Sequence, residues 1–381
     1  MNDSYDSRQA SILQKARAFV KAEIAPYVCS FETQQAIPKA LIKKMAKHGF
    51  LTPTMPLELG GLALDPVYYG SFLEIFGKVC MGSRSLLTVH NSLVSEVLLR
   101  FGTETQKTQW LGKLISGEMI GAFALSEPDV GSDSKNLHTT WRKDGNAYVI
   151  DGVKKWITLG GLADLFIVIA QNNGHQTAFL IEVKYKGIKV KKIQGLMAAK
   201  TTFLSEIHFN KVVVTDENIL GKLNSAHHYV VSMALDHGRY DIAWAGVAIA
   251  QAALEAMVLY SRKRSQFSKK LREFQLIRGI IADAVTKVHA ARAICIRAGE
   301  LRRMKDDRAI IETTIAKYFS SKVAVEVAND AVQVHGGNGF IDQYPVERLY
   351  REAKVLEIIE GTSQIQQEII ANYGLSAYWK A

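Results

Sequence analysis

The sequence predicts an α+β protein in which a β domain lies between two helical regions. Apolar residues recur at helical spacing up to about residue 115 and again from about residue 224. Between them, short segments are rich in β-branched and aromatic residues. The 381 residues, 48% of them hydrophobic, are enough for two or three domains. We place an all-α N-terminal domain at 1–117, an antiparallel β-barrel-like middle domain at 118–222 and a C-terminal four-helix bundle domain at 223–381.

The N-terminal region reads as a series of amphipathic helices. In "SRQASILQKARAFVKAEIAPYV", Pro26 falls near the end of the first helix and Pro38 opens the next. The segment "SLLTVHNSLVSEVLLRFG" predicts a later helix that ends at Gly102. The apolar residues of the first helix recur three and four positions apart: Ile12, Leu13, Ala16, Phe19 and Val20.

The middle and C-terminal regions have different signals. Strands are predicted in "NAYVIDGVKKWIT", "DLFIVIAQ", "TAFLIEV", "GIKVKKI" and "SEIHFNKVVV", and "KDGN" at 143–146 predicts a hairpin turn. After residue 224 come three helical patterns of about thirty residues each, a length typical of a helix bundle.

Composition narrows the classes of function. The net charge of +10 favours an anionic partner or a basic solvated surface, and both remain open. No basic run is interleaved with aromatics, so we expect no nucleic-acid binding. The apolar runs are short and the N-terminus is polar, so we expect neither a membrane span nor a signal peptide. Cys29, Cys80 and Cys295 lack metal or disulfide spacing, which fits reduced thiols in a cytoplasmic protein.

Four polar or glycine-containing segments are candidates for ligand binding. The loop "FALSEPDVGSDSKN" (123–136) offers hydroxyls and backbone N–H groups to a flat heterocycle, and "KKWITLGG" (154–161) offers an aromatic wall beside a hydroxyl. "SRKRSQF" (261–267) has basic residues that can hold a pyrophosphate, and "QVHGGNGF" (333–340) permits close backbone approach. Each segment taken alone is also explained as a surface loop, a core tryptophan, a solvated charge cluster or a helix terminator.

Glu360 occupies an unusual place in "VLEIIEGTSQIQQEII". It follows Ile358 and Ile359, and Gly361 leaves room beside it. Ser363 and Gln366 have capping-box spacing, so we expect Glu360 in the turn before a helix. A carboxylate partly shielded from water is a stronger base, although an exposed loop glutamate explains the segment too.

In this order, "ALSEPDVGSD", "WIT", "RKRSQF…FQ", "QVHGGNGF" and "EGTSQIQ" give the whole chain a resemblance to the acyl-CoA dehydrogenase family. The resemblance implies FAD as cofactor and Glu360 as catalytic base. It implies substrate contacts at Ser132, Arg239 and Gly361. It implies cofactor contacts at Phe123, Leu125, Ser126, Gly131, Ser132, Trp156, Thr158, Arg264, Phe267, Gln275, Gln333, Val334, Gly336, Gly337, Thr362 and Gln364.

The resemblance also implies the chemistry. In the family a carboxylate removes the α proton of an acyl thioester while hydride leaves the β carbon for flavin N5. A flavin hydroxyl and the N–H of the base residue bind the thioester carbonyl. The family is usually tetrameric, so we expect a homo-oligomer and an electron acceptor such as an electron-transfer flavoprotein.

Several positions depart from the usual family pattern. These are Val130, Asn136, Gln343, Gln367 and Asn372; the last two stand where many members carry arginines. "GSRSLLTVHNS" (82–92), "ALDHGRYDIAWAGVAIAQA" (234–252), "ETTIAKYFSS" (312–321) and "KVLEIIEGTSQIQ" (354–366) look like dehydrogenases of polyketide and nonribosomal-peptide biosynthesis. Those enzymes oxidise a short hydroxyacyl or aminoacyl group tethered to an acyl carrier protein. Carrier proteins are acidic, and a +10 enzyme is complementary to them.

Several functions remain open at this stage. We expect a flavin dehydrogenase acting on a carrier-protein-tethered polar acyl group, and a conventional short-chain acyl-CoA dehydrogenase is the alternative. An acyl oxidase or flavin monooxygenase and a non-catalytic binding protein are further candidates. We predict no metal site: His227, His228 and His237 are close in sequence, but their spacing fits no standard metal site.

Overall fold

The computed structural model describes residues 3–379, which divide into two compact units. The helical unit comprises Met1–Pro26, Asp65–Met81 and Arg239–Ala381. The mixed unit comprises Tyr27–Leu64 and Gly82–Gly238. The helices of residues 1–117 are therefore distributed over both units.

Most helices of the mixed unit precede its strands in the sequence. α5 (Met81–Leu86), the π-helix η4 (Leu87–Ser95) and α6 (Glu96–Phe101) follow one another without a break, and Gly102 is the C-cap, as predicted. The other helices are α2 (Val28–Gln34), α3 (Lys39–Lys47), η3 (Leu57–Leu59), α7 (Glu104–Gln106), η5 (Lys107–Leu111), α8 (Gly112–Ile115), η6 (Asp216–Asn218) and η7 (His227–Val231).

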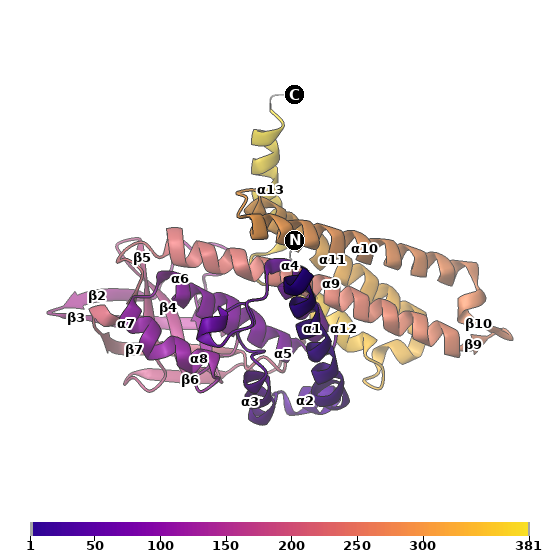
Figure 1. The fold of residues 1–381 in the computed structure, drawn as a ribbon, viewed down its shortest axis with the longest axis horizontal. Helices are drawn as coiled ribbons and strands as arrows, with labels where there is room; N and C mark the ends of the chain where they lie inside the picture. Colours follow the sequence, from indigo (N-terminus) through magenta and orange to yellow (C-terminus); the bar gives the residue numbers. More distant parts are fainter. Residues whose placement is uncertain (1–2, 380–381) are drawn as a thin grey trace. The chain divides into compact units, whose positions relative to one another are not determined.

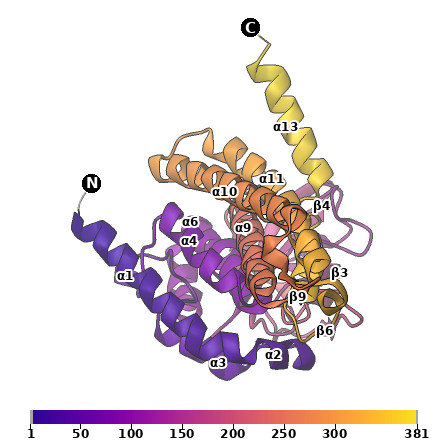
Figure 2. The same cartoon turned by 90° about the vertical axis from the view of Figure 1, so that its right-hand side faces the viewer.

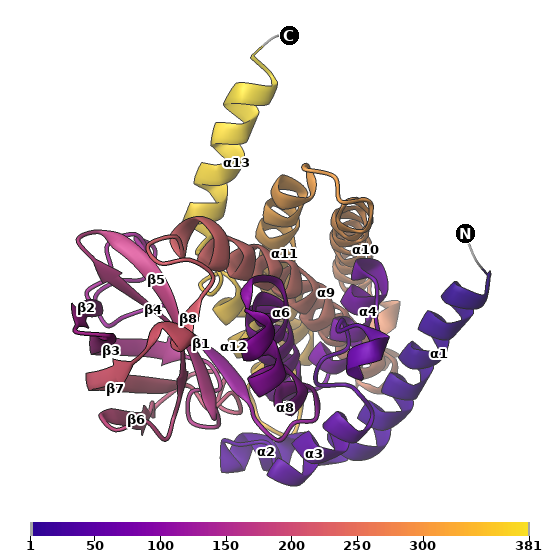
Figure 3. The same ribbon diagram turned by 60° about the vertical axis from the view of Figure 1, so that its left-hand side comes forward.

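The strands form one sheet with the order β6-β7-β3-β2-β4-β5-β8, and β1 pairs with β4 (Figure 3). Most pairs are antiparallel, as predicted, but β1–β4 and β2–β4 are parallel. Asp144 pairs with Ala147, which confirms the predicted hairpin, and Gly145 in its turn has φ +59°. The strands are β1 (Gly121–Ala124), β2 (Thr140–Asp144), β3 (Ala147–Ile157), β4 (Leu165–Asn172), β5 (His175–Glu182), β6 (Ile188–Lys192), β7 (Ser205–Val214) and β8 (Ile219–Leu220).

A hydrophobic core joins the helices of this unit to one face of its sheet. Every second residue of β4 enters it, namely Leu165, Ile167 and Ile169, as expected from the alternation of side chains along a strand. Val94 and Trp110 of η4 and η5 belong to the same cluster. Packing on the helices therefore fixes the part of the sheet where β1 pairs with β4.

The helical unit is built on the three long helices predicted after residue 224. These are α9 (Ser232–Lys263), α10 (Gln275–Met304) and α11 (Ala309–His335), which run side by side (Figure 1). α11 also packs against α12 (Val346–Leu356), α13 (Ser363–Ala377) and the 3₁₀ turn η9 (Gly336–Phe340). Figure 2 shows α13 leading away from α10 and α11 to the C-terminus. The unit also holds α1 (Asp3–Phe19), η1 (Val20–Ile24), η2 (Ala25–Tyr27), α4 (Pro66–Gly77), the hairpin β9 (Ser265–Gln266) and β10 (Lys269–Lys270), and η8 (Leu271–Glu273).

α9 and α11 approach closely because of a glycine. A Cβ atom on Gly246 of α9 would lie 2.6 Å from the carbonyl carbon of Ser320 on α11. The helical stretch His227–Lys263 is long and apolar enough to cross a membrane by length and composition alone. Within it, 67% of the most apolar window is buried in the protein, which is also typical of a core helix.

Candidate active site

The loop after β1 is held by a buried ion pair. Lys154 Nζ lies 2.8 Å from Glu127 Oε1 and donates to the Leu125 carbonyl at 2.8 Å. Glu127 also accepts the backbone N–H of His138 (2.5 Å) and Thr139 (2.9 Å). Burial raises the pKa of Glu127, whereas Lys154 and these hydrogen bonds lower it. Their combined effect is larger than that of burial, so the pKa lies below its usual value. The candidate residues Leu125 and Ser126 are thus fixed by a partner on β3.

Trp156 lies beside this loop on an irregular part of β3. The pairing of β3 with β7 shifts register between Lys154 and Ile157, and Trp156 adopts φ +64°. The Lys155 N–H donates to the Ser126 carbonyl at 2.9 Å, which joins the bulge to the loop. Trp156 is 51% exposed, so the predicted aromatic wall is presented to solvent rather than used as core.

The remaining candidates of the mixed unit lie on the same two segments. Phe123 and Leu125 are buried, Ser126 and Thr158 are half-buried, and Gly131 and Ser132 are exposed. The mixed unit therefore brings together the first seven of the predicted cofactor residues.

In the helical unit, three candidates lie around the β9–β10 hairpin. Phe267 and Ser268 form its turn with φ +50° and +60°, and Phe267 is 89% exposed at the tip. The Phe267 ring meets that of Phe274 edge-on at 6.4 Å. Arg264 precedes β9 and Gln275 begins α10, and both side chains are exposed.

The end of α11 is connected to this region through Tyr260. The rings of Tyr260 and His335 stack with centroids 4.1 Å apart, and Asn338 Nδ2 donates to the Tyr260 hydroxyl at 2.9 Å. Tyr260 lies on the last turns of α9, shortly before Arg264. The helical unit thus places the candidates Gln333, Val334, Gly336 and Gly337 at the same end of the bundle as the hairpin.

Glu360 lies in the turn before α13, as predicted. It is half-buried, its Oε2 is buried, and its backbone is in the left-handed region at φ +54°. Gly361 follows at φ +87°. A non-glycine residue in this region costs roughly 1–3 kcal/mol and persists only where its surroundings hold it, which is common at functional sites.

The predicted capping box of Ser363 and Gln366 is wrong. The helix begins one residue earlier than predicted, and Gln366 has other partners. The N-cap is Thr362, whose Oγ1 accepts the Ile365 N–H at 3.4 Å. Gln366 is fully buried, and its Nε2 donates to the carbonyls of Glu360 and Gly361, each at 3.1 Å. The glutamine amide therefore serves the preceding turn. Gln364, also a candidate, is exposed on the first turn of α13.

Two cations lie near the Glu360 turn, and one was missed from the sequence. Lys317 on α11 is buried, and its Nζ donates to the Gly361 carbonyl at 2.6 Å. The predicted Arg239 is half-buried, with Nη2 at 3.8 Å from the position of a Cβ on Gly361. The pKa of Lys317 is lowered to about 8, mainly because the side chain is buried. The negative charges of Glu360 and Glu357 oppose this shift, and the positive charge of Arg239 adds to it. Lys317 shares the buried stripe of Thr313, Ser320 and Ala324, so its helical spacing was the available signal.

Four of the five departures from the family pattern have local contacts. Val130 belongs to the core cluster of the mixed unit. Asn136 Nδ2 donates to Asp133 at 2.7 Å. Gln367 Nε2 donates to the Tyr318 hydroxyl at 3.0 Å, and Asn372 Nδ2 donates to Glu368 at 3.1 Å.

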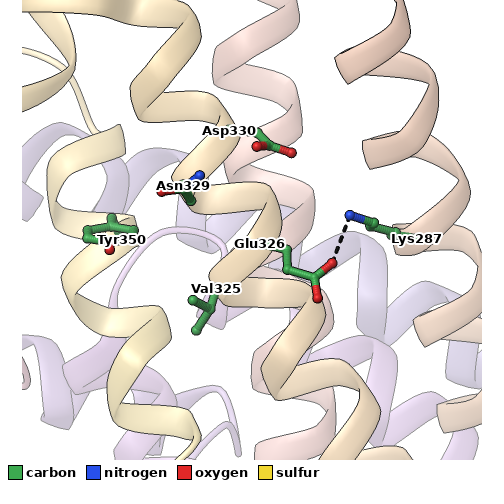
Figure 4. A pocket seen from close by; sticks show the side chains of 6 residues that line it. All are labelled: Lys287, Val325, Glu326, Asn329, Asp330 and Tyr350. Atoms are coloured by element: carbon green, nitrogen blue, oxygen red, sulfur yellow. Dashed lines mark ion pairs between the residues drawn. The ribbon is translucent and has the colours of Figure 1, made fainter.

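A pocket of about 280 Å³ lies elsewhere in the helical unit, among α10, α11 and α12 (Figure 4). Lys287 and Glu326 form an ion pair of 2.7 Å at its wall. The other lining residues are Val325, Asn329, Asp330 and Tyr350, and none of the predicted site residues lines it. In residues 3–379, no group of three His, Cys, Asp or Glu side chains is arranged to hold a metal; His237 pairs with Glu96.

Comparison with protein families covers most of the chain. Residues 6–118 match the N-terminal domain of acyl-CoA dehydrogenases, residues 122–212 the middle domain and residues 228–375 the C-terminal domain. An acyl-CoA dehydrogenase of Bacillus subtilis is 38% identical over 374 residues, 96% of this chain and 97% of the relative. The caffeyl-CoA reductase–Etf complex subunit CarC of Acetobacterium woodii is 35% identical over 374 residues, covering 96% and 98%.

Solved structures agree over nearly the whole length. Butyryl-CoA dehydrogenase of Megasphaera elsdenii matches with a TM-score of 0.93 and 32% identity, covering 98% of this chain and 99% of the other. A glutaryl-CoA dehydrogenase of Mycobacterium smegmatis in complex with FADH2 matches at 0.92 and 25%, covering 99% and 95%. The prolyl acyl carrier protein oxidase AnaB matches at 0.90 and 26%, covering 98% and 99%.

The residues present fit FAD. An exposed tryptophan beside a rigid loop suits a flat polar-edged ring, and an exposed arginine near a glycine-rich helix end suits a pyrophosphate. Family, fold and residues agree: the chain belongs to the acyl-CoA dehydrogenase family and is an FAD-dependent oxidoreductase that acts on CH–CH donors.

Proposed function

We propose that this enzyme oxidises a short-chain acyl-CoA between its α and β carbons, with Glu360 as the base. The observation that carries the proposal is the turn at Glu360, where a half-buried carboxylate is held in a left-handed backbone conformation and the following residue, Gly361, lies close to Lys317 and Arg239. Most of the similar proteins named above act on acyl-CoA thioesters, which supports the same substrate class here.

The chain's own residues account for the proton. A thioester makes its α C–H weakly acidic, and the Glu360 carboxylate accepts that proton. Lys317 interacts electrostatically with Glu360, and the carboxylate raises the pKa of this buried lysine. FAD, when bound, supplies the acceptor for the hydride that leaves the β carbon. We assign its ring to the segments of Ser126 and Trp156, and its phosphates to that of Arg264.

Anaerobic mixing with butyryl-CoA tests this proposal. We expect the flavin absorbance near 450 nm to bleach in the wild type, because reduced flavin loses that band. Glu360→Gln keeps the shape of the side chain and removes the base, so it should retain FAD and fail to bleach. Unchanged bleaching in that variant would refute Glu360 as the base.

A second candidate is oxidation of a short polar acyl group carried by an acyl carrier protein. The observation that favours it is a buried polar segment on α5 and η4. Arg84 is 3% exposed and donates to the hydroxyls of Thr88 (3.0 Å) and Ser85 (3.2 Å). Arg84 belongs to the segment 82–92 that resembles the carrier-protein-dependent dehydrogenases, and its hydrogen bonds hold the polar side chains of that segment in place.

Two further features support the second candidate. The similar oxidase AnaB acts on a prolyl group bound to a carrier protein, and the net charge of +10 complements an acidic carrier. Flavin bleaching by seryl- or glyceryl-carrier protein, compared with butyryl-CoA at equal concentration, separates the candidates. Faster bleaching by the carrier-bound thioesters would favour the second one.

For electron acceptor we propose an electron-transfer flavoprotein, because CarC is part of a complex with one. The proposal also includes a homo-oligomer and a cytoplasmic location. Peroxide release under air, in place of electron transfer to such a flavoprotein, would indicate an oxidase.

A further inference from the structure

The main chain at Glu360 and Gly361 is gripped by two buried side chains from different helices. Lys317 reaches the Gly361 carbonyl from α11 at 2.6 Å. Gln366 reaches the carbonyls of both turn residues from α13 at 3.1 Å. Lys317 and Gln366 are each 0% exposed. Water therefore does not compete for these carbonyls, and the hydrogen bonds hold the turn more firmly than exposed ones can.

The turn requires such support. Both of its residues lie at positive φ, which a glutamate adopts only at a cost. A Cβ on Gly361 would lie 2.7 Å from Gln366 Nε2, so the glycine is what allows Gln366 to close on the turn. Without the two donors, the peptide of Glu360 is free to relax toward negative φ, which turns its side chain to another direction.

The free-energy cost of burying the charged Lys317 also indicates that this side chain has a function. A lysine buried on an otherwise apolar or small-residue stripe destabilises the fold unless its charge is used. The charged groups that face Lys317 are Glu360, Glu357 and Arg239. The first two attract its ammonium and the third repels it, so the lysine is held by the catalytic turn and not by a dedicated ion pair.

We propose that Lys317 and Gln366 are positioning residues. Together these two side chains, the clamp, fix the backbone of Glu360 so that its carboxylate points at the substrate's α proton. The inference rests on the proposed role of Glu360. Lys317 additionally interacts electrostatically with Glu360. Neither side chain is required to touch substrate or cofactor for this role.

Lys317→Met is the sharpest test. It removes the charge and the Gly361 hydrogen bond and keeps an apolar stem of similar length. The rate of flavin bleaching by butyryl-CoA should fall by about tenfold to a hundredfold, because small misplacements of a reacting group have effects of this size. The urea midpoint should change little, because the variant removes the desolvation cost of the buried ammonium together with its hydrogen bond. A purely structural lysine would instead lower the midpoint and leave the bleaching rate of the folded enzyme unchanged.

Hydrogen exchange gives a readout that does not depend on turnover. Hydrogen exchange of the peptide spanning 356–366 should be faster in Lys317→Met and in Gln366→Met than in the wild type. Lys322→Met, on the exposed face of the same helix, is the matched control and should exchange and bleach like the wild type. Exchange unchanged in both clamp variants would overturn the proposal.

The pH profile gives an independent check. The pKa of Lys317 is about 8 because it is buried, so its ammonium is lost as the pH rises through that value. A neutral amine donates a weaker hydrogen bond. The wild-type bleaching rate should therefore decline near pH 8 toward that of Lys317→Met, whose profile should lack this step. A step of equal size in both enzymes would contradict the proposal.

The outcomes separate this inference from the proposed function. If Glu360→Gln fails to bleach while Lys317→Met bleaches at the wild-type rate, the base stands and the clamp is refuted. If Glu360→Gln bleaches normally, both are refuted. Failure of Glu360→Gln together with slowed bleaching and faster exchange in the clamp variants supports both.

Discussion

Lys154 and Glu127 form an ion pair of 2.8 Å with both side chains out of contact with solvent. The same ammonium donates to the carbonyl of Leu125, the residue that leads into the loop of Ser126. The pair therefore joins β3 to the loop that we assign to the flavin ring. It holds the segment of Trp156 and the segment of Ser126 together.

Removing one member of this pair should be far worse than removing both. Lys154→Met leaves Glu127 buried with its main cation gone, so we expect a loss of about 3–5 kcal/mol in the free energy of unfolding. The double variant Lys154→Met/Glu127→Gln should recover most of that loss, because no unpaired charge remains. Urea unfolding of the two singles and the double gives the coupling energy; additive losses would argue against the pair.

Gly361→Ala should impair both stability and flavin reduction. The position has φ +87°, and the added Cβ would lie 2.7 Å from Gln366 Nε2. We expect a loss of about 1–3 kcal/mol from the backbone strain. Gly374→Ala on α13 is the control, because a Cβ there meets nothing within 4 Å. Thermal unfolding and flavin bleaching by butyryl-CoA measure the two effects. An unchanged thermal midpoint would show that the turn accommodates the added Cβ without strain.

Glu360→Gly should stabilise the protein while abolishing the reaction. Glycine occupies positive φ without the steric cost that glutamate has there, and Glu360 is at φ +54°. A gain of up to about 1 kcal/mol is expected, measured by urea unfolding of the FAD-loaded enzyme. A loss of stability would mean that the Glu360 side chain contributes more by its contacts than its backbone costs.

Acid should destabilise the mixed unit through His90. This side chain is buried; its Nε2 lies 2.9 Å from the Leu114 carbonyl, and its Nδ1 accepts the Gly121 N–H at 3.0 Å. Those roles require the neutral ring, and burial lowers the pKa of His90 to about 4. Because the unfolded chain binds a proton that the folded chain does not, the stability contribution is full above pH 6.5 and is lost as the pH falls toward 4.

The expected loss from His90 is about 3 kcal/mol across that range. Unfolding free energies of wild type and His90→Gln at pH 7 and pH 4.5 measure it. The variant starts lower but should lose less on acidification. Equal losses in the two proteins would assign the acid sensitivity to other groups.

Gly246→Ala should separate α9 from α11, because the new Cβ would lie 2.6 Å from main-chain atoms of Ser320. Overpacking of this kind costs about 1–3 kcal/mol. Gly279→Ala on α10 meets nothing within 4 Å and should stabilise by up to about 1 kcal/mol through helix propensity. Thermal midpoints that shift equally for both would contradict the close packing of the two helices.

The sequence by itself determined the class of fold, the hairpin at Gly145 and the turn that carries Glu360. Those features depend on local signals: the spacing of apolar residues, a two-residue turn and a glycine before a helix. It also indicated the family, because the motifs occur in a fixed order along one chain.

Only the tertiary structure decided which polar side chains support those motifs. The parallel pairing of β1 with β4, the bond from Lys154 to Glu127 and the reach of Lys317 to Gly361 join residues far apart in sequence. Gln366 looked like half of a capping box and serves the preceding turn instead. A side chain's partner depends on which buried carbonyls lack a donor, and packing of whole helices and strands sets that.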